Sequence, residues 1–293
     1  MRQQRVLVVG ATGNQGGAVV DHLLSGDYGE FDVHALTRNP QGERAQRLAD
    51  RGATIVTGDL LDKDDLGSAI EGVDAVYLVT TPDGGPDAET EKGRNMVDVA
   101  ADADIEHFVF SSVCGVERGI GIAFFDPKYA IEQRIEELGL PTTIIRPVAL
   151  MQTFEAQRRA VLGGTFTLPL AEGTPLQMVD TGDIGALTAT AMAAPEAYIG
   201  ETFSVAGDEH TLESAAATLT DVTGIETSAN HLSIAAARDQ IGDGPAQIYD
   251  WINKEGFDVD IKALESDLPI ELTDFESYLY NHGWGSLGEE SGN

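Results

Sequence analysis

The sequence predicts an α/β fold, with a doubly wound parallel sheet over residues 1–150 and a smaller α+β lobe over 151–285. Short apolar runs typical of buried strands alternate six times with segments of helical spacing. The first of these runs leads directly into a turn with three glycines that opens an amphipathic helix. We expect one added strand near 200–206, which makes the smaller lobe partly interleaved with the sheet, and a frayed tail at 286–293.

Each element is assigned from apolar spacing, helix caps and glycine stops. The predicted strands of the sheet are 5–9, 31–37, 54–57, 75–79, 107–111 and 142–146. The helices between them are 15–25, 41–51, 62–70, 87–101 and 127–138, with Asp62 and Asp126 as N-caps. Helices are also predicted at 154–162, 183–193, 211–223, 234–241, 246–254 and 274–282.

The composition is strongly acidic. The 293 residues include 49 Asp and Glu against 18 Lys and Arg, a net charge of -31. This surplus is typical of halophilic proteins in a salt-rich cytoplasm, where counterions screen charge within about 3 Å at 1 M salt. It argues against direct nucleic-acid binding, which depends on cationic contacts to phosphates. No apolar run approaches the roughly 18 residues that span a bilayer, so we expect a cytoplasmic protein without membrane contact.

Metal and disulfide chemistry receive no support from the sequence. Cys114 is the single cysteine, so an intrachain disulfide is excluded, and the six histidines are scattered. Cys114 follows the fifth predicted strand, where a packing role is favoured over a redox role.

The glycine-rich turn after the first strand has the spacing of a phosphate-binding loop. Gly10 allows a tight turn, Gly13 allows a pyrophosphate to approach the backbone, and Gly16 allows the helix to pack on the strand. The helix N-terminus adds N–H donors and a positive dipole end. We therefore predict a dinucleotide site here; the alternative is a turn without a ligand. The candidate residues are Gly10, Ala11, Thr12, Gly13, Asn14, Gln15 and Gly16.

The end of the second strand indicates which dinucleotide is bound. NAD-binding proteins usually carry an acid there for the ribose 2′-hydroxyl. No acid occurs between Val33 and Gly42, and Arg38 stands at the expected position. A guanidinium binds a 2′-phosphate with two donors, so NADP(H) is favoured over NAD(H). The alternative is an ordinary surface arginine.

Other strand ends supply further candidates, because ligands of doubly wound sheets bind outside the carboxyl ends of the strands. Asp59 is a candidate acceptor for an adenine amino group with Leu60 packing nearby, although a solvated acid explains it equally well. Thr80, Thr81 and Pro82 follow the fourth strand, where backbone faces the cofactor ribose. A simple turn is the alternative for these three residues.

Together these motifs resemble the NmrA-like family of atypical short-chain dehydrogenases/reductases, especially its NADPH sensors and NAD(P)H quinone reductases. The resemblance extends to about Trp284 and implies an NAD(P)-binding Rossmann domain in a bilobed molecule. It is carried by the glycine turn, 37–40, 58–60, 125–128, Arg146-Pro147, 151–154, 179–185, Gly207-Asp208 and Thr211. It implies cofactor contacts from Gly10–Gln15, Arg38, Asp59, Thr80, Thr81, Arg94, Lys128, Leu150, Met151, Gln152 and Thr153.

The chain departs from the family pattern at two places. Sensor members carry a second cation shortly after the arginine that matches Arg38, where this chain has Gln41 and Gly42. Arg44 is the candidate that compensates for this change.

The second departure concerns proton transfer. Typical short-chain dehydrogenases use Tyr-x-x-x-Lys; Lys128 matches the lysine, but Phe124 replaces the tyrosine. Tyr129 lies about 100° away around the helix and does not replace the missing phenol. Lys128 is the candidate catalytic residue and a ribose ligand; the alternative is an ion pair with a neighbouring acid.

Two functions follow from these observations. The first is a redox-sensing or regulatory NADP(H) binder, which acts through a protein partner and has no dehydrogenase turnover of its own. The second is an NADPH-dependent reductase of quinones or small carbonyl substrates, in which the hydride acceptor needs no protein acid. A nucleotide-sugar epimerase also needs the missing tyrosine and is less favoured. The sequence does not determine an oligomeric state.

Overall fold

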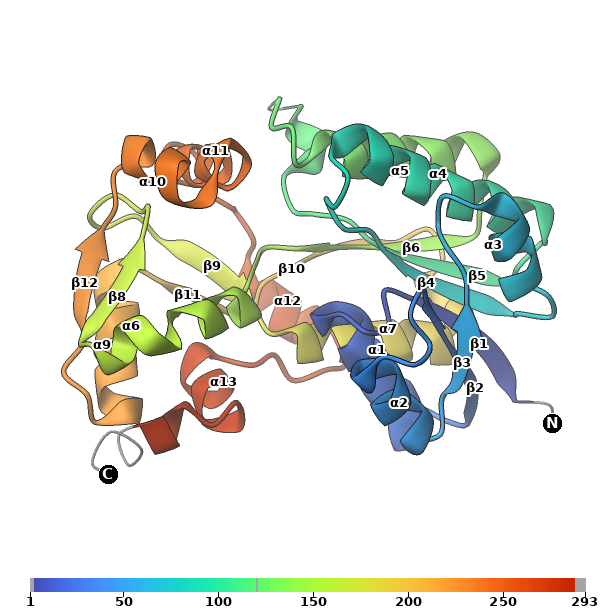
Figure 1. The fold of residues 1–293 in the computed structure, drawn as a ribbon, viewed down its shortest axis with the longest axis horizontal. Helices are drawn as coiled ribbons and strands as arrows, with labels where there is room; N and C mark the ends of the chain where they lie inside the picture. Colours follow the sequence, from blue (N-terminus) through green and yellow to red (C-terminus); the bar gives the residue numbers. More distant parts are fainter. Residues whose placement is uncertain (1–2, 120, 288–293) are drawn as a thin grey trace. The chain divides into compact units, whose positions relative to one another are not determined.

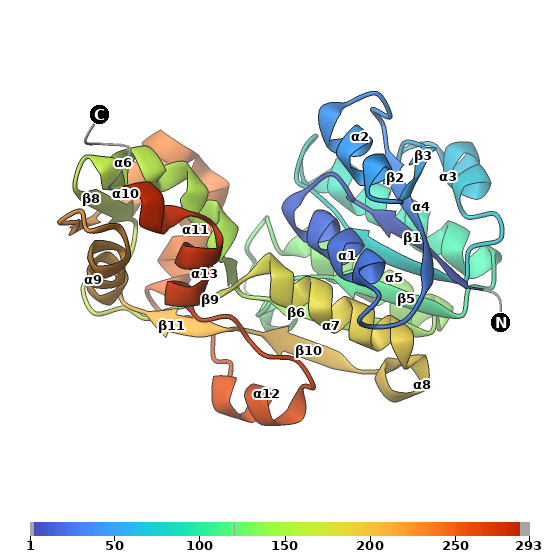
Figure 2. The same ribbon diagram turned by 90° about the horizontal axis from the view of Figure 1, so that it is seen from below.

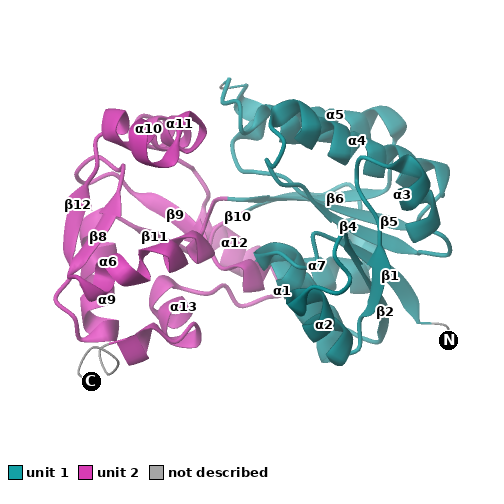
Figure 3. Ribbon diagram, in the orientation of Figure 1, with its two compact units in different colours: residues 1–147, 184–204 teal, residues 148–183, 205–293 magenta. Residues whose placement is uncertain are grey.

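The computed structural model describes residues 3–119 and 121–287, which form two compact units. Unit 1 comprises residues 1–147 and 184–204, and unit 2 comprises residues 148–183 and 205–293 (Figure 3). None of the helices in the described ranges combines the length and apolar character needed to cross a membrane.

Unit 1 is built on a parallel sheet, which confirms the predicted fold class. Within the described residues its seven strands are ordered β10-β6-β5-β4-β1-β2-β3. The order reverses between β1 and β4, which is the position where such sheets bind ligands. The strands are β1 (Gln4–Val9), β2 (Phe31–Thr37), β3 (Thr54–Thr57), β4 (Ala75–Val79), β5 (His107–Ser111), β6 (Thr142–Pro147) and β10 (Thr202–Val205).

Helices cover both faces of this sheet (Figures 1 and 2). One face carries α1 (Asn14–Ser25), α2 (Glu43–Asp50) and α7 (Thr181–Ala193). The other face carries α3 (Lys63–Ala69), α4 (Pro86–Asp102) and α5 (Asp126–Leu138). The short α8 (Pro195–Tyr198) precedes β10, and the 3-10 helix η1 (Val116–Arg118) follows β5.

The core of unit 1 fixes the position of α5. Phe108 and Phe110 of β5 are completely buried against Met96 of α4 and Ile131 of α5. At Gly93 of α4, an added Cβ would lie 2.1 Å from Ile131 Cδ1, so glycine is needed for these two helices to pack closely. This contact fixes α5, and therefore Lys128 in its first turn, against α4.

In the part of unit 2 that the structure describes, two small sheets have helices around them. Strand β9 (Leu176–Val179) pairs with β7 (Ala149–Leu150) and with β11 (Asp208–His210), and β8 (Thr165–Leu168) pairs with β12 (Ser228–His231). Its helical segments are η2 (Met151–Gln157), α6 (Arg158–Leu162), α9 (Leu212–Thr223), α10 (Ile234–Ile241), α11 (Asp243–Ile252), α12 (Ile261–Asp267), α13 (Phe275–Asn281) and η3 (Trp284–Ser286).

The largest differences from the expected elements lie in unit 2. Strands β7, β8, β9, β11 and β12 and helix α12 were not predicted from the sequence. The single helix expected at 154–162 is a 3-10 segment up to Gln157 followed by one short α-helix. Of the expected tail, Ser286 ends η3, and residues 288–293 lie outside the described residues.

The predicted N-cap of α5 is wrong by one residue. Phe125 is the N-cap, since its carbonyl accepts the first helical bond from Tyr129 N at 3.0 Å, and Asp126 is the first helical residue. The cause is a preceding turn, in which the N–H groups of Phe125 and Asp126 both donate to the carbonyl of Ile122. Lys128 nevertheless lies in the first turn. The other predicted N-cap, Asp62, is confirmed, since it accepts from the N–H groups of Asp64 and Asp65.

Candidate functional site

Two positions of the glycine-rich turn are packed so closely that they leave no room for a side chain. Gly10 has φ +78°, and an added Cβ would lie 2.6 Å from Val79 Cγ1. An added Cβ on Gly16 would lie 2.3 Å from the carbonyl oxygen of Gly10. These two glycines bring the start of α1 against the ends of β1 and β4, as the sequence pattern predicts.

The N-terminus of α1 has donors available for a ligand. Its N-cap is Gly13, which has no side chain to cap the helix, and its first turn contains no acid. The first N–H groups of a helix have no intrahelical acceptor, so those of this turn are left to solvent or to an anion. A pyrophosphate fits this helix start, because it needs backbone donors and no acid beside them.

The Gln15 side chain connects the glycine turn to the sheet. Its Oε1 accepts from Ser111 Oγ at 2.6 Å and from Tyr77 OH at 3.3 Å. Burial raises the pKa of Tyr77, so the phenol stays protonated and acts as a donor. Gln15 therefore holds the first turn of α1 in a fixed position relative to β4 and β5.

Two arginines lie on the β2 side of this turn. Arg44 Nη1 donates to the carbonyl of Thr12 at 2.9 Å, which places a guanidinium directly beside the glycine loop. Arg38 is 65% exposed and lies 3.5 Å from a carboxylate oxygen of Asp83. Arg38 and Arg44 are thus the cations available to a phosphate at the end of β2.

Lys128 is held in a buried polar cluster. Its Nζ lies 2.8 Å from the carbonyl oxygen of Thr80, 2.6 Å from Thr80 Oγ1 and 2.7 Å from Glu89 Oε1. These three acceptors match the three protons of an ammonium group. Burial lowers the pKa of Lys128, whereas the attraction of Glu89 acts in the opposite direction.

This cluster corresponds to the alternative interpretation of Lys128, an ion pair with a neighbouring acid. Thr80 Oγ1 also donates to Glu89 at 2.8 Å, so the cluster is closed on itself. Phe124 stands four residues before Lys128, and Tyr129 is 41% exposed. No phenol therefore occupies the usual proton-donor position.

The remaining candidates of unit 1 lie in loops or on the helix surface. Asp59 Oδ1 accepts from the N–H of Leu61 at 3.0 Å, and the carbonyl of Leu60 accepts from Asn95 Nδ2 at 3.0 Å. Thr81 and Pro82 are exposed in the loop after β4. Arg94 is exposed on α4, where it lines a shallow hollow with Asp87, Thr90, Glu91, Asn95 and Asp98.

The candidates in unit 2 are tied to one another and to the start of α7. Met151 is fully buried, and Thr153 Oγ1 donates to the carbonyl of Leu150 at 2.7 Å. Gln152 donates to Asp180 Oδ1 at 2.6 Å and accepts from the N–H of Thr181 at 3.1 Å. Both the nitrogen and the oxygen of the Gln152 amide therefore form hydrogen bonds with residues at the beginning of α7.

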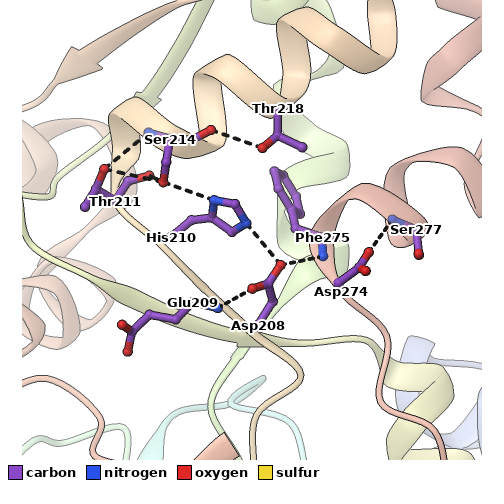
Figure 4. Close-up of polar contacts among 9 residues, drawn as sticks. All are labelled: Asp208, Glu209, His210, Thr211, Ser214, Thr218, Asp274, Phe275 and Ser277. Atoms are coloured by element: carbon purple, nitrogen blue, oxygen red, sulfur yellow. Dashed lines mark hydrogen bonds and ion pairs between the residues drawn. The ribbon is translucent and has the colours of Figure 1, made fainter.

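Around the motif residues Asp208 and Thr211, an Asp–His–Ser chain joins three elements (Figure 4). His210 Nε2 lies 3.0 Å from Asp208 Oδ2, and His210 Nδ1 lies 3.0 Å from Ser214 Oγ. Asp208 also accepts from the N–H of Phe275 at 2.8 Å. The chain thus connects β11 with the starts of α9 and α13, which indicates an anchoring role rather than a nucleophile.

Three residues that shape the site were not identified from the sequence. They are Glu89 and Lys92 on α4 and Asp83 in the loop after β4. Asp83 follows directly after the candidates Thr81 and Pro82, so an extended view of that strand end would have included it. Glu89 and Lys92 gave no signal, because acids and lysines on a helix normally face solvent.

Comparison with known proteins identifies the family of this chain. The NmrA-like family model matches residues 2–279. The chain belongs to the NmrA-like family. An NmrA-like family domain-containing protein of Dictyostelium discoideum is 39% identical over 140 residues, 46% of each chain. An NAD(P)H azoreductase of Xenophilus azovorans is 31% identical over 199 residues, 65% of this chain and 64% of that protein. The chain spans about half the length of the first curated relatives it matches.

Solved structures share the fold at lower identity. Triphenylmethane reductase of Citrobacter sp. with NADP(H) has a TM-score of 0.81 at 23% identity, covering 94% of this chain and 99% of that one. The NADPH-dependent quinone oxidoreductase QOR2 of Escherichia coli has a TM-score of 0.79 at 24% identity, with the same coverage. The negative transcriptional regulator Nmra with NAD has a TM-score of 0.73 at 19% identity, covering 99% and 95%.

Proposed function

We propose that this chain binds NADP(H) at the carboxyl ends of the strands of unit 1. The observation that carries the proposal is the glycine cradle, in which Gly10 and Gly16 leave no room for a Cβ and Gly13 leaves α1 without a side-chain cap. Such a helix start binds pyrophosphate through backbone donors and the helix dipole. Structural neighbours described with NADP(H), NADPH or NAD support the same assignment.

The preference for NADP(H) over NAD(H) rests on the end of β2. Arg38 is exposed there, and Arg44 is held beside the loop by its bond to Thr12. Since no acid occurs between Val33 and Gly42, this strand end offers cations to a 2′-phosphate and no carboxylate of its own to a ribose hydroxyl.

We further propose that the bound dinucleotide is sensed rather than consumed, with a regulatory protein as the partner. Phe124 replaces the phenol that would donate a proton, and the three Nζ protons of Lys128 face Thr80 and Glu89. The residues present can therefore hold the nucleotide, but they provide no general acid at the usual position.

The second candidate function is an NAD(P)H-dependent reductase of quinones or azo compounds. The names of two similar proteins, an azoreductase and a quinone oxidoreductase, favour it. Hydride transfer to an electron-poor acceptor does not require a protein acid, so the missing phenol is compatible with this activity.

Calorimetric titration of the full chain with NADPH and NADH tests the binding proposal. The net charge of -31 supports adaptation to a high-salt cytoplasm, so the titrations are made in both dilute and concentrated KCl. We expect NADPH to bind more tightly and Arg38→Ala to remove most of the difference. Arg47→Ala is the matched control, since Arg47 is an exposed arginine paired with Glu43. Equal affinities of the parent protein for both nucleotides would contradict the NADP(H) assignment.

A turnover assay separates the two functions. The oxidation of NADPH is followed by absorbance with a panel of quinones and azo dyes. Nucleotide binding without turnover supports the sensor, whereas steady turnover of any acceptor supports the reductase and rules out a pure sensor.

A further inference from the structure

An acidic residue lies beside the arginine on which nucleotide selection depends. Asp83 Oδ2 is 3.5 Å from Arg38 Nη2, although the two residues are 45 positions apart in the sequence. Asp83 belongs to the loop between β4 and α4, and Arg38 follows β2. The carboxylate that the end of β2 lacks is therefore supplied from another strand end.

Asp83 is also held by Lys92 and Thr81. Lys92 Nζ lies 3.1 Å from Asp83 Oδ2 and donates to the carbonyl of Asp83 at 2.6 Å. Thr81 Oγ1 donates to the other carboxylate oxygen. The Lys92 side chain is only 7% exposed, whereas that of Arg38 is 65% exposed. When this contact opens, Arg38 is therefore the side chain that moves, and Asp83 stays in place.

The carboxylate remains charged at neutral pH. The hydrogen bonds from Thr81 and then Lys92 lower the pKa of Asp83 to about 2. A nearby anion would therefore be repelled by this negative charge, which the Lys92 ammonium, 3.1 Å from Asp83 Oδ2, and solvent at this half-exposed position both weaken.

From this arrangement we propose that Asp83 is a specificity-determining residue that competes with the nucleotide 2′-phosphate for Arg38. The inference rests on the proposed binding of NADP(H) and goes beyond it. Arg38 favours a 2′-phosphate by charge and by two parallel donors, whereas Asp83 opposes it by holding the guanidinium and repelling the phosphate. A ribose 2′-hydroxyl carries no charge and is not repelled. Asp83 thus lowers the affinity for NADPH relative to the affinity for NADH, so that the two affinities differ less than they would without it.

The test is the substitution Asp83→Asn, which keeps the size of the side chain and leaves the backbone contact with Lys92. Dissociation constants for NADPH and NADH are measured by calorimetry in dilute KCl. We expect NADPH to bind about tenfold more tightly, roughly 1.4 kcal/mol, and the affinity for NADH to change by less than about twofold. Concentrated KCl should reduce the gain, since screening weakens the repulsion.

Two further variants separate the proposed contact from general charge effects. Asp87→Asn makes the same change in net charge in the first turn of α4, and we expect no gain in NADPH affinity from it. In an Arg38→Ala background, Asp83→Asn should gain much less than in the parent protein, because the cation for which Asp83 competes is absent. Thermal unfolding of each variant establishes that it is folded.

The outcomes distinguish this inference from the proposed function. If the parent protein binds both nucleotides and Asp83→Asn leaves the ratio of their affinities unchanged, the role of Asp83 is wrong and the binding site stands. An equal gain in NADPH affinity from Asp87→Asn would also overturn the role of Asp83, because the change in net charge would then explain the effect. If the parent binds neither nucleotide, the proposed function itself fails, and the inference fails with it.

Discussion

Helices α1 of unit 1 and α9 of unit 2 both begin shortly after a strand, but their N-termini differ. The N-cap of α1 is Gly13, without a side chain, and its first turn contains no acid. The N-cap of α9 is Thr211, whose Oγ1 accepts from the N–H of Ser214 at 3.2 Å, with the chain from Asp208 through His210 packed around it. A helix start already satisfied by its own chain is structural, whereas one left open has donors for a ligand.

The largest effect is expected when α1 is given a side-chain cap like that of α9. Gly13 has extended backbone angles that an N-cap aspartate adopts, so Gly13→Asp would cap α1 and place a negative charge in the cradle. We expect NADPH affinity to fall by at least about 1,000-fold, or roughly 4 kcal/mol. The new cap stabilises α1, whereas the added Cβ would lie 3.2 Å from the carbonyl oxygen of Gly10, so thermal stability should change little. Calorimetric titration and thermal unfolding measure the two effects.

The matched control removes the cap from α9. Thr211→Ala should lower the free energy of unfolding by about 1 kcal/mol and leave nucleotide affinity unchanged. If Gly13→Asp binds NADPH normally, the N-terminus of α1 is not the phosphate site, and the distinction between open and closed helix starts has no functional meaning here.

The Lys128 cluster extends the comparison to a closed site in unit 1. Lys128→Met leaves the Glu89 carboxylate, which is 3% exposed, without its cation. We expect the free energy of unfolding to fall by about 3–5 kcal/mol, measured by urea denaturation, since an uncompensated buried charge is costly. The double variant Lys128→Met, Glu89→Gln should recover most of this loss and should bind NADPH within a few-fold of the parent. Loss of binding in a stable double variant would show that Lys128 contacts the nucleotide.

The start of α7 offers a smaller, pH-dependent effect. Asp183 is 3% exposed, and burial raises its pKa to about 6, although Thr273 donates to both of its oxygens. The folded state therefore holds this proton more tightly than the unfolded chain. The stability that the protonated form contributes is complete below about pH 4 and is lost as the pH rises through 6, by up to about 3 kcal/mol. Urea denaturation between pH 4 and 8 should show this decline in the parent protein, but not in Asp183→Asn. If the free energy of unfolding changes with pH in the same way in the parent protein and in Asp183→Asn, the raised pKa of Asp183 is wrong.

The sequence predicted unit 1 well and unit 2 poorly, for a physical reason. The central strands β1, β4 and β5 of the large sheet are mostly buried, so each contains an apolar run that can be recognised locally. Strand β12, with the sequence Ser-Ala-Asn-His, has no such pattern. It is a strand because β8 pairs with it, from Ser228 opposite Thr165 to His231 opposite Leu168, and that contact is remote in sequence.

The sequence alone determined the glycine cradle, the cap at Asp62 and the absence of a phenol four residues before Lys128. These features depend on backbone freedom, helix capping and residue identity, which act over a few neighbouring positions. Only the tertiary structure decided that Lys128 pairs with Glu89 and that Arg38 faces Asp83. Those pairs join side chains from different strand ends and helices, so their charges meet only after the sheet and its helices have assembled.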